Sequence, residues 1–286
     1  MIGLQEAELM KRALVTLAVG ERYLQMFDRY CRGTWHAYAE RHHMDLVVLP
    51  RALDDSPRAQ SRSVSWQKCL VLSAPEIAPY EQVVWVDADI LINPMSPDVG
   101  RDVPVDRIGA ADEYATPTKE DYEILLRRKY AQWSAAGEPY ISNLTPTEYH
   151  TQFGLEGHFD SVVQAGVLVI SPRFHRDLLE HVYRHYEDKG APEWNFEMRP
   201  LSYEILTNRL EHWISPKFNM PWASLRALYY PFVDRLSLID KGLRKSGLRH
   251  GSRLSRKCAT TAFLNNYFLH FSGGEVRDMG LVDLKS

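Results

Sequence analysis

The chain has 286 residues, of which 45% are hydrophobic and 25% charged, and this is an ordinary composition for a folded globular protein. Its net charge of −3 argues against a general attraction to nucleic acid or to anionic membranes. The three cysteines are widely spaced, which argues against a disulfide framework or a CxxC zinc site. The apolar stretch at residues 13–19 is too short to cross a bilayer, so we expect a cytoplasmic protein.

The first elements predicted along the chain form a strand–helix–strand unit. A strand over about residues 12–19 ends at Gly20, and a helix over 21–42 carries aromatic and apolar residues three or four apart. A short apolar strand over 46–49 is stopped by Pro50. This order predicts an α/β fold with a mainly parallel sheet.

The following elements extend the same pattern. A helix over 65–74 precedes a strand over 83–86, whose continuous apolar run is typical of a strand buried on both faces. Later elements are predicted as strands over 108–112, 161–171 and 267–271 and as helices over 174–189 and 200–209. No linker is obvious, so we expect a single domain over 1–286.

Two carboxylates, Asp87 and Asp89, follow the most apolar strand. Side chains alternate along a strand, so both carboxylates can point the same way. Ligands of an open parallel sheet bind beyond the carboxyl ends of its strands, and paired carboxylates suit Mg²⁺ or Mn²⁺. The pair therefore predicts a metal site that neutralises a diphosphate leaving group, against the alternative of a strand end that faces solvent.

Other enzymes that use a DxD motif fit the sequence less well. A haloacid-dehalogenase phosphatase has a DxDx[TV] motif on its first strand, whereas here Leu91 occupies the last position and earlier elements precede the motif. A nucleotidylyltransferase needs a glycine-rich, arginine-containing loop after its first strand, and residues 20–22 (GER) are too short for that role.

Five short motifs, in order over about residues 12–275, resemble the glycogenin-like and lipopolysaccharide-galactosyltransferase-like retaining families of the GT-A glycosyltransferase fold. They are residues 15–23 (VTLAVGERY), 65–68 (SWQK), 87–89 (DAD), 164–170 (QAGVLVI) and 269–274 (LHFSGG). The resemblance implies an α/β GT-A fold with a mainly parallel central sheet flanked by helices and a small C-terminal subregion. It also implies a nucleotide-binding half over 12–112 and an acceptor-binding half over 113–286.

The same resemblance implies which residues bind the nucleotide-sugar donor. The backbone of the first strand would meet the base and ribose, Tyr23 would stack on the base, and Lys68 would approach the donor ahead of the DxD motif. Asp112 would bind donor hydroxyls, and Gly273 and Arg277 would lie near the diphosphate, with Arg277 in place of a family lysine. The donor-binding set is Thr16, Leu17, Ala18, Val19, Tyr23, Lys68, Asp87, Ala88, Asp89, Asp112, Gly273 and Arg277.

For the reaction centre, the resemblance implies that His270 completes a metal site with Asp87 and Asp89. Gln164 stands where the family has an asparagine near the sugar and acceptor, so it joins the catalytic set. Glu204 is the acid in place near the family's Asp-Gln pair, and it could lie under the sugar.

We therefore expect a Mn²⁺- or Mg²⁺-dependent glycosyltransferase. It would transfer a sugar from a UDP-sugar, with retention, to a saccharide, lipid-linked or other small acceptor, and no nucleic acid partner is expected. The alternatives are a sugar-nucleotide hydrolase, a nucleotidylyltransferase and a catalytically silent sugar-nucleotide-binding protein. The basic segment 235–257 is either a lid over the diphosphate, a peripheral membrane contact or a plain exposed loop. The sequence leaves the oligomeric state open.

Overall fold

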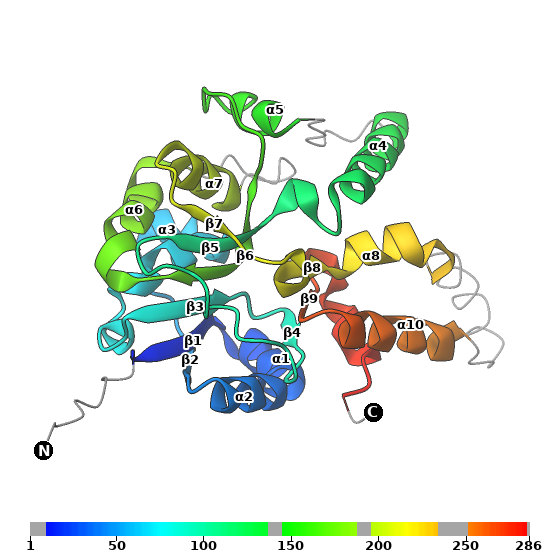
Figure 1. Cartoon of the computed structure of the whole chain (residues 1–286), viewed down its shortest axis with the longest axis horizontal. Helices are drawn as coiled ribbons and strands as arrows, with labels where there is room; N and C mark the ends of the chain where they lie inside the picture. The colour runs from blue at the N-terminus through cyan, green and yellow to red at the C-terminus, as the bar shows by residue number, and fades with distance from the viewer. Residues whose placement is uncertain (1–9, 137–144, 188–195, 234–250, 285–286) are drawn as a thin grey trace, which may run out of the picture.

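A computed structural model describes residues 10–136, 145–187, 196–233 and 251–284. Its centre is a six-stranded sheet in the order β2-β1-β3-β6-β5-β7 (Figure 1). The strands are β1 (Arg12–Leu17), β2 (Asp45–Leu49), β3 (Gln82–Val86), β5 (Ile108–Asp112), β6 (Val163–Ile170) and β7 (Glu211–Trp213). β6 runs antiparallel to β3 and β5, and the other pairs are parallel. The predicted mainly parallel α/β fold is confirmed.

One face of the sheet is covered by α1 (Glu21–Tyr30) and α2 (Arg32–Arg41), which bury Phe27 and Trp35 against β1, β3 and β6. The prediction of one continuous helix over 21–42 was wrong, because the chain turns at Cys31. The apolar spacing continues across the break, since both helices pack on the same core. The break places the side chain of Cys31 against the loop that follows β3.

The opposite face is covered by η1 (Val64–Ser73), α6 (Pro172–His185) and α7 (Met198–Thr207), which share a second core with the sheet. The predicted helix over 65–74 is a 3₁₀ helix, and the Ser63 side chain accepts a hydrogen bond from Ser65 N at its start. Two shorter helices, α3 (Pro57–Gln60) and η2 (Pro75–Ile77), flank η1.

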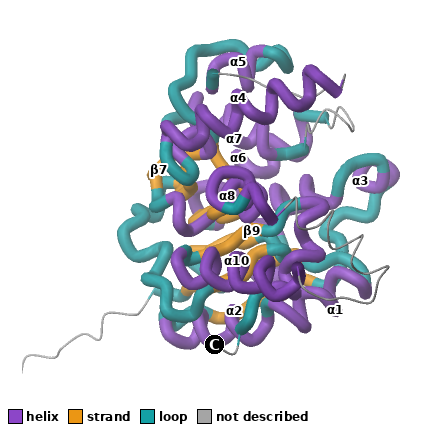
Figure 2. Tube along the Cα trace, turned by 90° about the vertical axis from the view of Figure 1, so that its right-hand side faces the viewer, coloured by secondary structure: helices purple, strands orange, loops and turns teal. Residues whose placement is uncertain are grey.

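A second, smaller sheet has the order β4-β9-β8, with β4 (Ile90–Ile92), β9 (Phe268–His270) and β8 (Met220–Pro221). Around it lie η4 (Pro216–Asn219), α8 (Trp222–Tyr229), α10 (Gly251–Asn265) and η5 (Gly273–Leu281). Figure 2 shows α8 and α10 in front of β9. Residues 87–89 connect β3 of the large sheet to β4 of the small sheet, so the DxD motif is the junction between the two.

The remaining described helices, η3 (Glu113–Ala115), α4 (Lys119–Ala136) and α5 (Pro146–Thr151), follow β5 and lead towards β6 (Figure 1). Of the basic segment 235–257, residues 235–250 lie outside the described residues. The described remainder begins α10 and exposes Arg253, Arg256 and Lys257. Among the described helices, none combines the length and apolar character needed to cross a membrane.

Candidate active site

The DxD motif lies in a turn that is held from both sides. Asp87 N donates to Gly166 O of β6 at 2.9 Å, and Phe271 N donates to Asp89 O at 3.0 Å. The turn closes through Ile90 N, which donates to Asp87 O at 3.1 Å. We expected the alternation of side chains along a strand to point both carboxylates the same way. Instead, Ala88 and Asp89 belong to this turn, so the turn sets the directions of the two carboxylates.

The break between α1 and α2 supports the same turn from below. The Cys31 sulfur lies 3.5 Å from Ala88 O and 3.4 Å from Ile90 O, so its one proton is shared between these carbonyls. Trp35 Nε1 donates to Ile90 O at 2.9 Å. Burial raises the pKa of the Cys31 thiol, and the Asp89 carboxylate raises it further, so the thiol keeps the proton that it donates.

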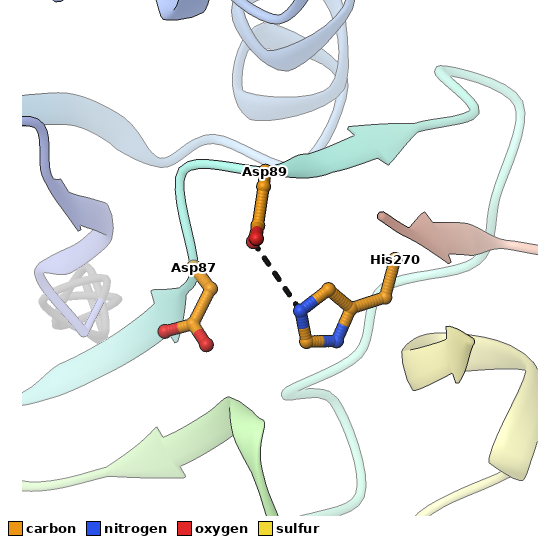
Figure 3. A group of neighbouring side chains, drawn as sticks. All are labelled: Asp87, Asp89 and His270. Atoms are coloured by element: carbon orange, nitrogen blue, oxygen red, sulfur yellow. Dashed lines mark ion pairs between the residues drawn. The ribbon is translucent and has the colours of Figure 1, made fainter. Parts of the chain in front are cut away.

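His270, at the end of β9, completes a cluster with the two aspartates (Figure 3). Each of the three residues offers a ligand atom within 4.8 Å of the others, and His270 Nε2 lies 3.3 Å from Asp89 Oδ1. His270 Nδ1 lies 2.9 Å from Oδ1 of the buried Asn219. Because that oxygen can only accept, the Nδ1 proton is directed to it and the Nε2 lone pair is left for a metal.

The charges around the cluster suit a divalent cation. Burial alone would lower the pKa of His270, but the Asp89 and Asp87 carboxylates raise it overall, so proton and metal compete for the same imidazole. The two carboxylates are hard oxygen ligands of the kind that Mn²⁺ and Mg²⁺ prefer, and an imidazole is a ligand of many divalent transition metals. The residues present are therefore able to hold a divalent cation.

Lys68 lies behind the cluster, inside the protein. Its ammonium is 2.9 Å from Asp87 Oδ1, 2.7 Å from Glu197 Oε1 and 3.0 Å from Ala165 O. Burial alone would lower the pKa of Lys68, but Asp87 and Glu197 raise it overall, so the lysine is a cation. Trp85 Nε1 donates to Asp87 Oδ1 at 2.9 Å and fixes that carboxylate further.

A cleft of about 350 Å³ opens above the two aspartates. Residues predicted to bind the donor form part of its lining, namely Leu17, Val19, Tyr23, Lys68, Asp87, Ala88 and Asp89. The ring of Tyr23 is 54% exposed and is accessible to a flat base. Thr16 and Ala18 are fully buried behind the lining, so any contact from them with a ligand is limited to the backbone.

Three further predicted residues have structural partners away from the metal cluster. Gln164 Nε2 donates to Glu113 Oε2 at 2.6 Å, and Asp112 Oδ1 accepts from Tyr114 N at 2.9 Å and Val162 N at 3.2 Å. Glu204 accepts from the Tyr186 hydroxyl and lies 3.5 Å from His181 Nε2. The structure therefore does not bring Gln164, Asp112 or Glu204 into contact with Asp87, Asp89 and His270.

Gly273 and Arg277 lie exposed in η5, directly after β9, and neither is part of the cleft lining. Three residues that sequence reasoning missed are Glu197, Asn219 and Trp85. Of these three, only Trp85 could have been found from the local sequence, because it stands two positions before Asp87. Glu197 and Asn219 act through contacts with residues that are distant in the sequence.

The fold and the site together define an α/β protein with an acidic, histidine-completed cluster at the carboxyl end of a central strand. No protein-family model and no curated protein sequence matches the chain. Among solved structures, it is similar to a glycosyltransferase involved in the glycosylation of the major capsid of PBCV-1. The TM-score is 0.50 at 9% identity, over 94% of this chain and 98% of that one.

The bifunctional glycosyltransferase WbbM matches with a TM-score of 0.50 and 12% identity, over 96% of this chain and 50% of that one, so this chain spans about half of WbbM. The galactosyltransferase LgtC, solved with donor and acceptor sugar analogues, has a TM-score of 0.45 and 13% identity, over 94% of each chain. The likeness to the first two proteins shows the fold. This chain has the GT-A fold of glycosyltransferases, as the motifs predicted.

Proposed function

We propose that this protein is a metal-dependent glycosyltransferase that transfers a sugar from a UDP-sugar to a saccharide, lipid-linked or other small acceptor. The observation that carries the proposal is the convergence of Asp87 and Asp89, which line the cleft, with His270 from β9 in one cluster of metal-ligand groups. An ion pair between Asp89 and His270 alone would not require the Asp87 carboxylate to lie within 4.8 Å of both groups.

In this proposal the cleft receives the nucleotide. The lining residues Leu17 and Val19 lie at the end of β1, where their backbone groups can meet the base and ribose. Tyr23 stacks on the base through its exposed ring. The diphosphate then lies above the turn at Asp87 and Asp89.

Asp87, Asp89 and His270 Nε2 would hold Mn²⁺ or Mg²⁺ at this position. When bound, the metal supplies Lewis-acid stabilisation of the charge that develops on the leaving diphosphate. Asn219 accepts the Nδ1 proton of His270, so the Nε2 atom faces the metal position. Trp85 and Lys68 contact the Asp87 carboxylate and hold it in place. Arg277 lies in η5, which follows β9, and its side chain is exposed. In this proposal it would add a contact to a phosphate.

Retention of the anomeric configuration is part of the proposal and rests on the resemblance of the motifs. The acceptor hydroxyl would attack on the face from which the diphosphate leaves, without a covalent intermediate on Glu204. The contacts of Glu204 with Tyr186 and His181 support this choice, because they direct its carboxylate towards α6. The cytoplasmic location and the division into halves at residue 112 stay predictions.

The proposal is tested by calorimetric titration of UDP into the wild-type protein, with Mn²⁺ and then with EDTA. We expect binding only with the metal. Asp89→Asn should weaken metal-dependent binding by more than about 100-fold, because even residues that merely orient metal ligands commonly contribute 10–100-fold. The matched control is Asp160→Asn, whose side chain is 96% exposed and should bind UDP like the wild type.

A second measurement separates the proposed transferase from the alternatives. Release of free sugar from UDP-sugars without any acceptor product would indicate a hydrolase instead. Donor binding without turnover across a broad acceptor panel would indicate a silent binding protein. UDP binding that is equal with EDTA and with Mn²⁺ would contradict the metal-dependent site.

A further inference from the structure

Glu197 forms a buried ion pair with Lys68 that the donor site described above does not require. Its side chain is 4% exposed and lies directly before α7, and Oε1 is 2.7 Å from the Lys68 ammonium. The same ammonium contacts Asp87 Oδ1 at 2.9 Å and Ala165 O at 3.0 Å. Lys68 therefore has three acceptors for its three protons, and it is shared between a metal ligand and a second carboxylate.

A lysine in contact with a metal ligand opposes metal binding. Asp87 and Asp89 together contribute two negative charges, and the Lys68 cation beside Asp87 leaves a net charge of about −1 around the cluster. The Lys68 side chain is buried and that of Asp87 is mostly buried, so solvent screens the two charges weakly and the opposition is strong. The ammonium of Lys68 contacts both Asp87 oxygens, at 2.9 Å and 3.2 Å, so without a counter-charge its full positive charge would act on the metal ligand.

Glu197 is placed to remove this opposition. Its carboxylate lies 2.7 Å from the Lys68 ammonium and cancels the positive charge that this ammonium places beside Asp87. The second oxygen, Oε2, is buried and has no hydrogen-bond partner among the described residues. A buried carboxylate with an unpaired oxygen is unfavourable for stability. Its presence beside the metal cluster therefore points to a role other than stabilising the fold.

We propose that Glu197 is a positioning residue that acts through Lys68 and keeps the Asp87–Asp89–His270 cluster anionic enough to bind a divalent cation. This inference rests on the proposed metal-dependent function. Lys68 can then remain beside the donor as a fixed cation, while Asp87 keeps oxygen lone pairs for the metal. The structure thereby places a buried lysine beside a candidate metal cluster, which the sequence motifs alone do not explain.

The test is the affinity of the nucleotide-free protein for Mn²⁺, measured by electron paramagnetic resonance. Glu197→Gln preserves shape and removes the charge, so Mn²⁺ should bind about tenfold or more weakly. The double variant Lys68→Met/Glu197→Gln removes both charges and should return to within about threefold of the wild type. Glu180→Gln, which removes a carboxylate paired with Arg184 at the surface, is the matched control and should bind like the wild type.

Each outcome decides the inference. Unchanged Mn²⁺ affinity in a folded Glu197→Gln variant would overturn it, and so would a double variant as weak as the single one, because the effect would then come from packing. If Glu197→Gln does not fold, Lys68→Met alone decides: binding at least as tight as in the wild type supports the charge argument, and weaker binding overturns it. Absence of Mn²⁺ binding by the wild type would instead contradict the proposed metal-dependent function itself.

Discussion

Gly166 leaves the space in which His270 and Asn219 meet. A Cβ atom at this position would lie 2.8 Å from His270 Cε1 and 2.9 Å from both Asn219 Nδ2 and Oδ1. Gly166→Ala should therefore push the histidine and its partner out of position. We expect Mn²⁺-dependent UDP binding to fall about 10–100-fold, with about 1–3 kcal/mol of destabilisation.

Calorimetry for binding and urea unfolding for stability measure this prediction. The matched control is Gly33→Ala in α2, because a Cβ at Gly33 meets no atom within 4 Å. That change should leave binding unaltered and should stabilise the fold by about 0.5–1 kcal/mol. Normal binding by Gly166→Ala would mean that His270 does not need its present position.

At the same scale, the sequence itself indicated Asp87 and Asp89, because paired carboxylates follow a strongly apolar strand, whereas His270 was added only by the family resemblance. Sequence reasoning could not reach Asn219 or Glu197, since each acts only on a partner far along the chain: His270 for Asn219 and Lys68 for Glu197. Glu204 stays a prediction. It was chosen as the acid nearest to the family's Asp-Gln pair, and in the structure it contacts Tyr186 and His181, about two helical turns from Glu197.

At the scale of elements, the longer strands were predictable, whereas the short strands β4, β7 and β8 and the break between α1 and α2 were not. Apolar periodicity reports burial against a core, and both short helices pack against the same core, so the pattern runs through Cys31 without interruption. The antiparallel direction of β6 was equally hidden. It depends on where the chain returns to the sheet after α5, which is a matter of tertiary packing rather than of local sequence.

α5 docks on α7 through a buried, neutral histidine. His150 Nδ1 lies 2.9 Å from Pro146 O and Nε2 lies 3.2 Å from Ser202 Oγ, with no exposed surface on the side chain. Burial lowers the pKa of His150 from 6.5 to about 4. Its contribution to stability is therefore complete above pH 6.5 and is lost as the pH falls from 6.5 towards 4, by about 3 kcal/mol in all.

His150→Gln should remove this pH dependence. We expect the free energy of unfolding of the wild type to exceed that of the variant by about 3 kcal/mol more at pH 7.5 than at pH 4. Urea unfolding at both pH values measures the difference. His36→Gln is the control, because its side chain is 60% exposed, and its curve should run parallel to the wild type. A parallel curve for His150→Gln would contradict the assignment.

At the scale of the whole molecule, the site is also the joint between two sheets. Asp87 follows β3 of the large sheet, whereas Asp89 precedes β4 and His270 ends β9 of the small sheet. β4 and β9 pair with Ile90 opposite His270. A shift of His270 or Asp89 therefore displaces the backbone of the small sheet directly. The small sheet therefore contributes to the candidate site as directly as the large sheet does.

A ligand bound at such a joint should stabilise both sheets together. With Mn²⁺ and UDP at about 100 times their Kd, linkage gives about 2.7 kcal/mol of stabilisation. Hydrogen exchange should then slow in β3, β4 and β9 of the wild type, and the unfolding midpoint should rise by about 5 °C. Asp89→Asn should show neither effect, and Asp160→Asn should show both. Protection confined to β3 would mean that the nucleotide binds to the large sheet alone and that His270 does not take part in holding the metal.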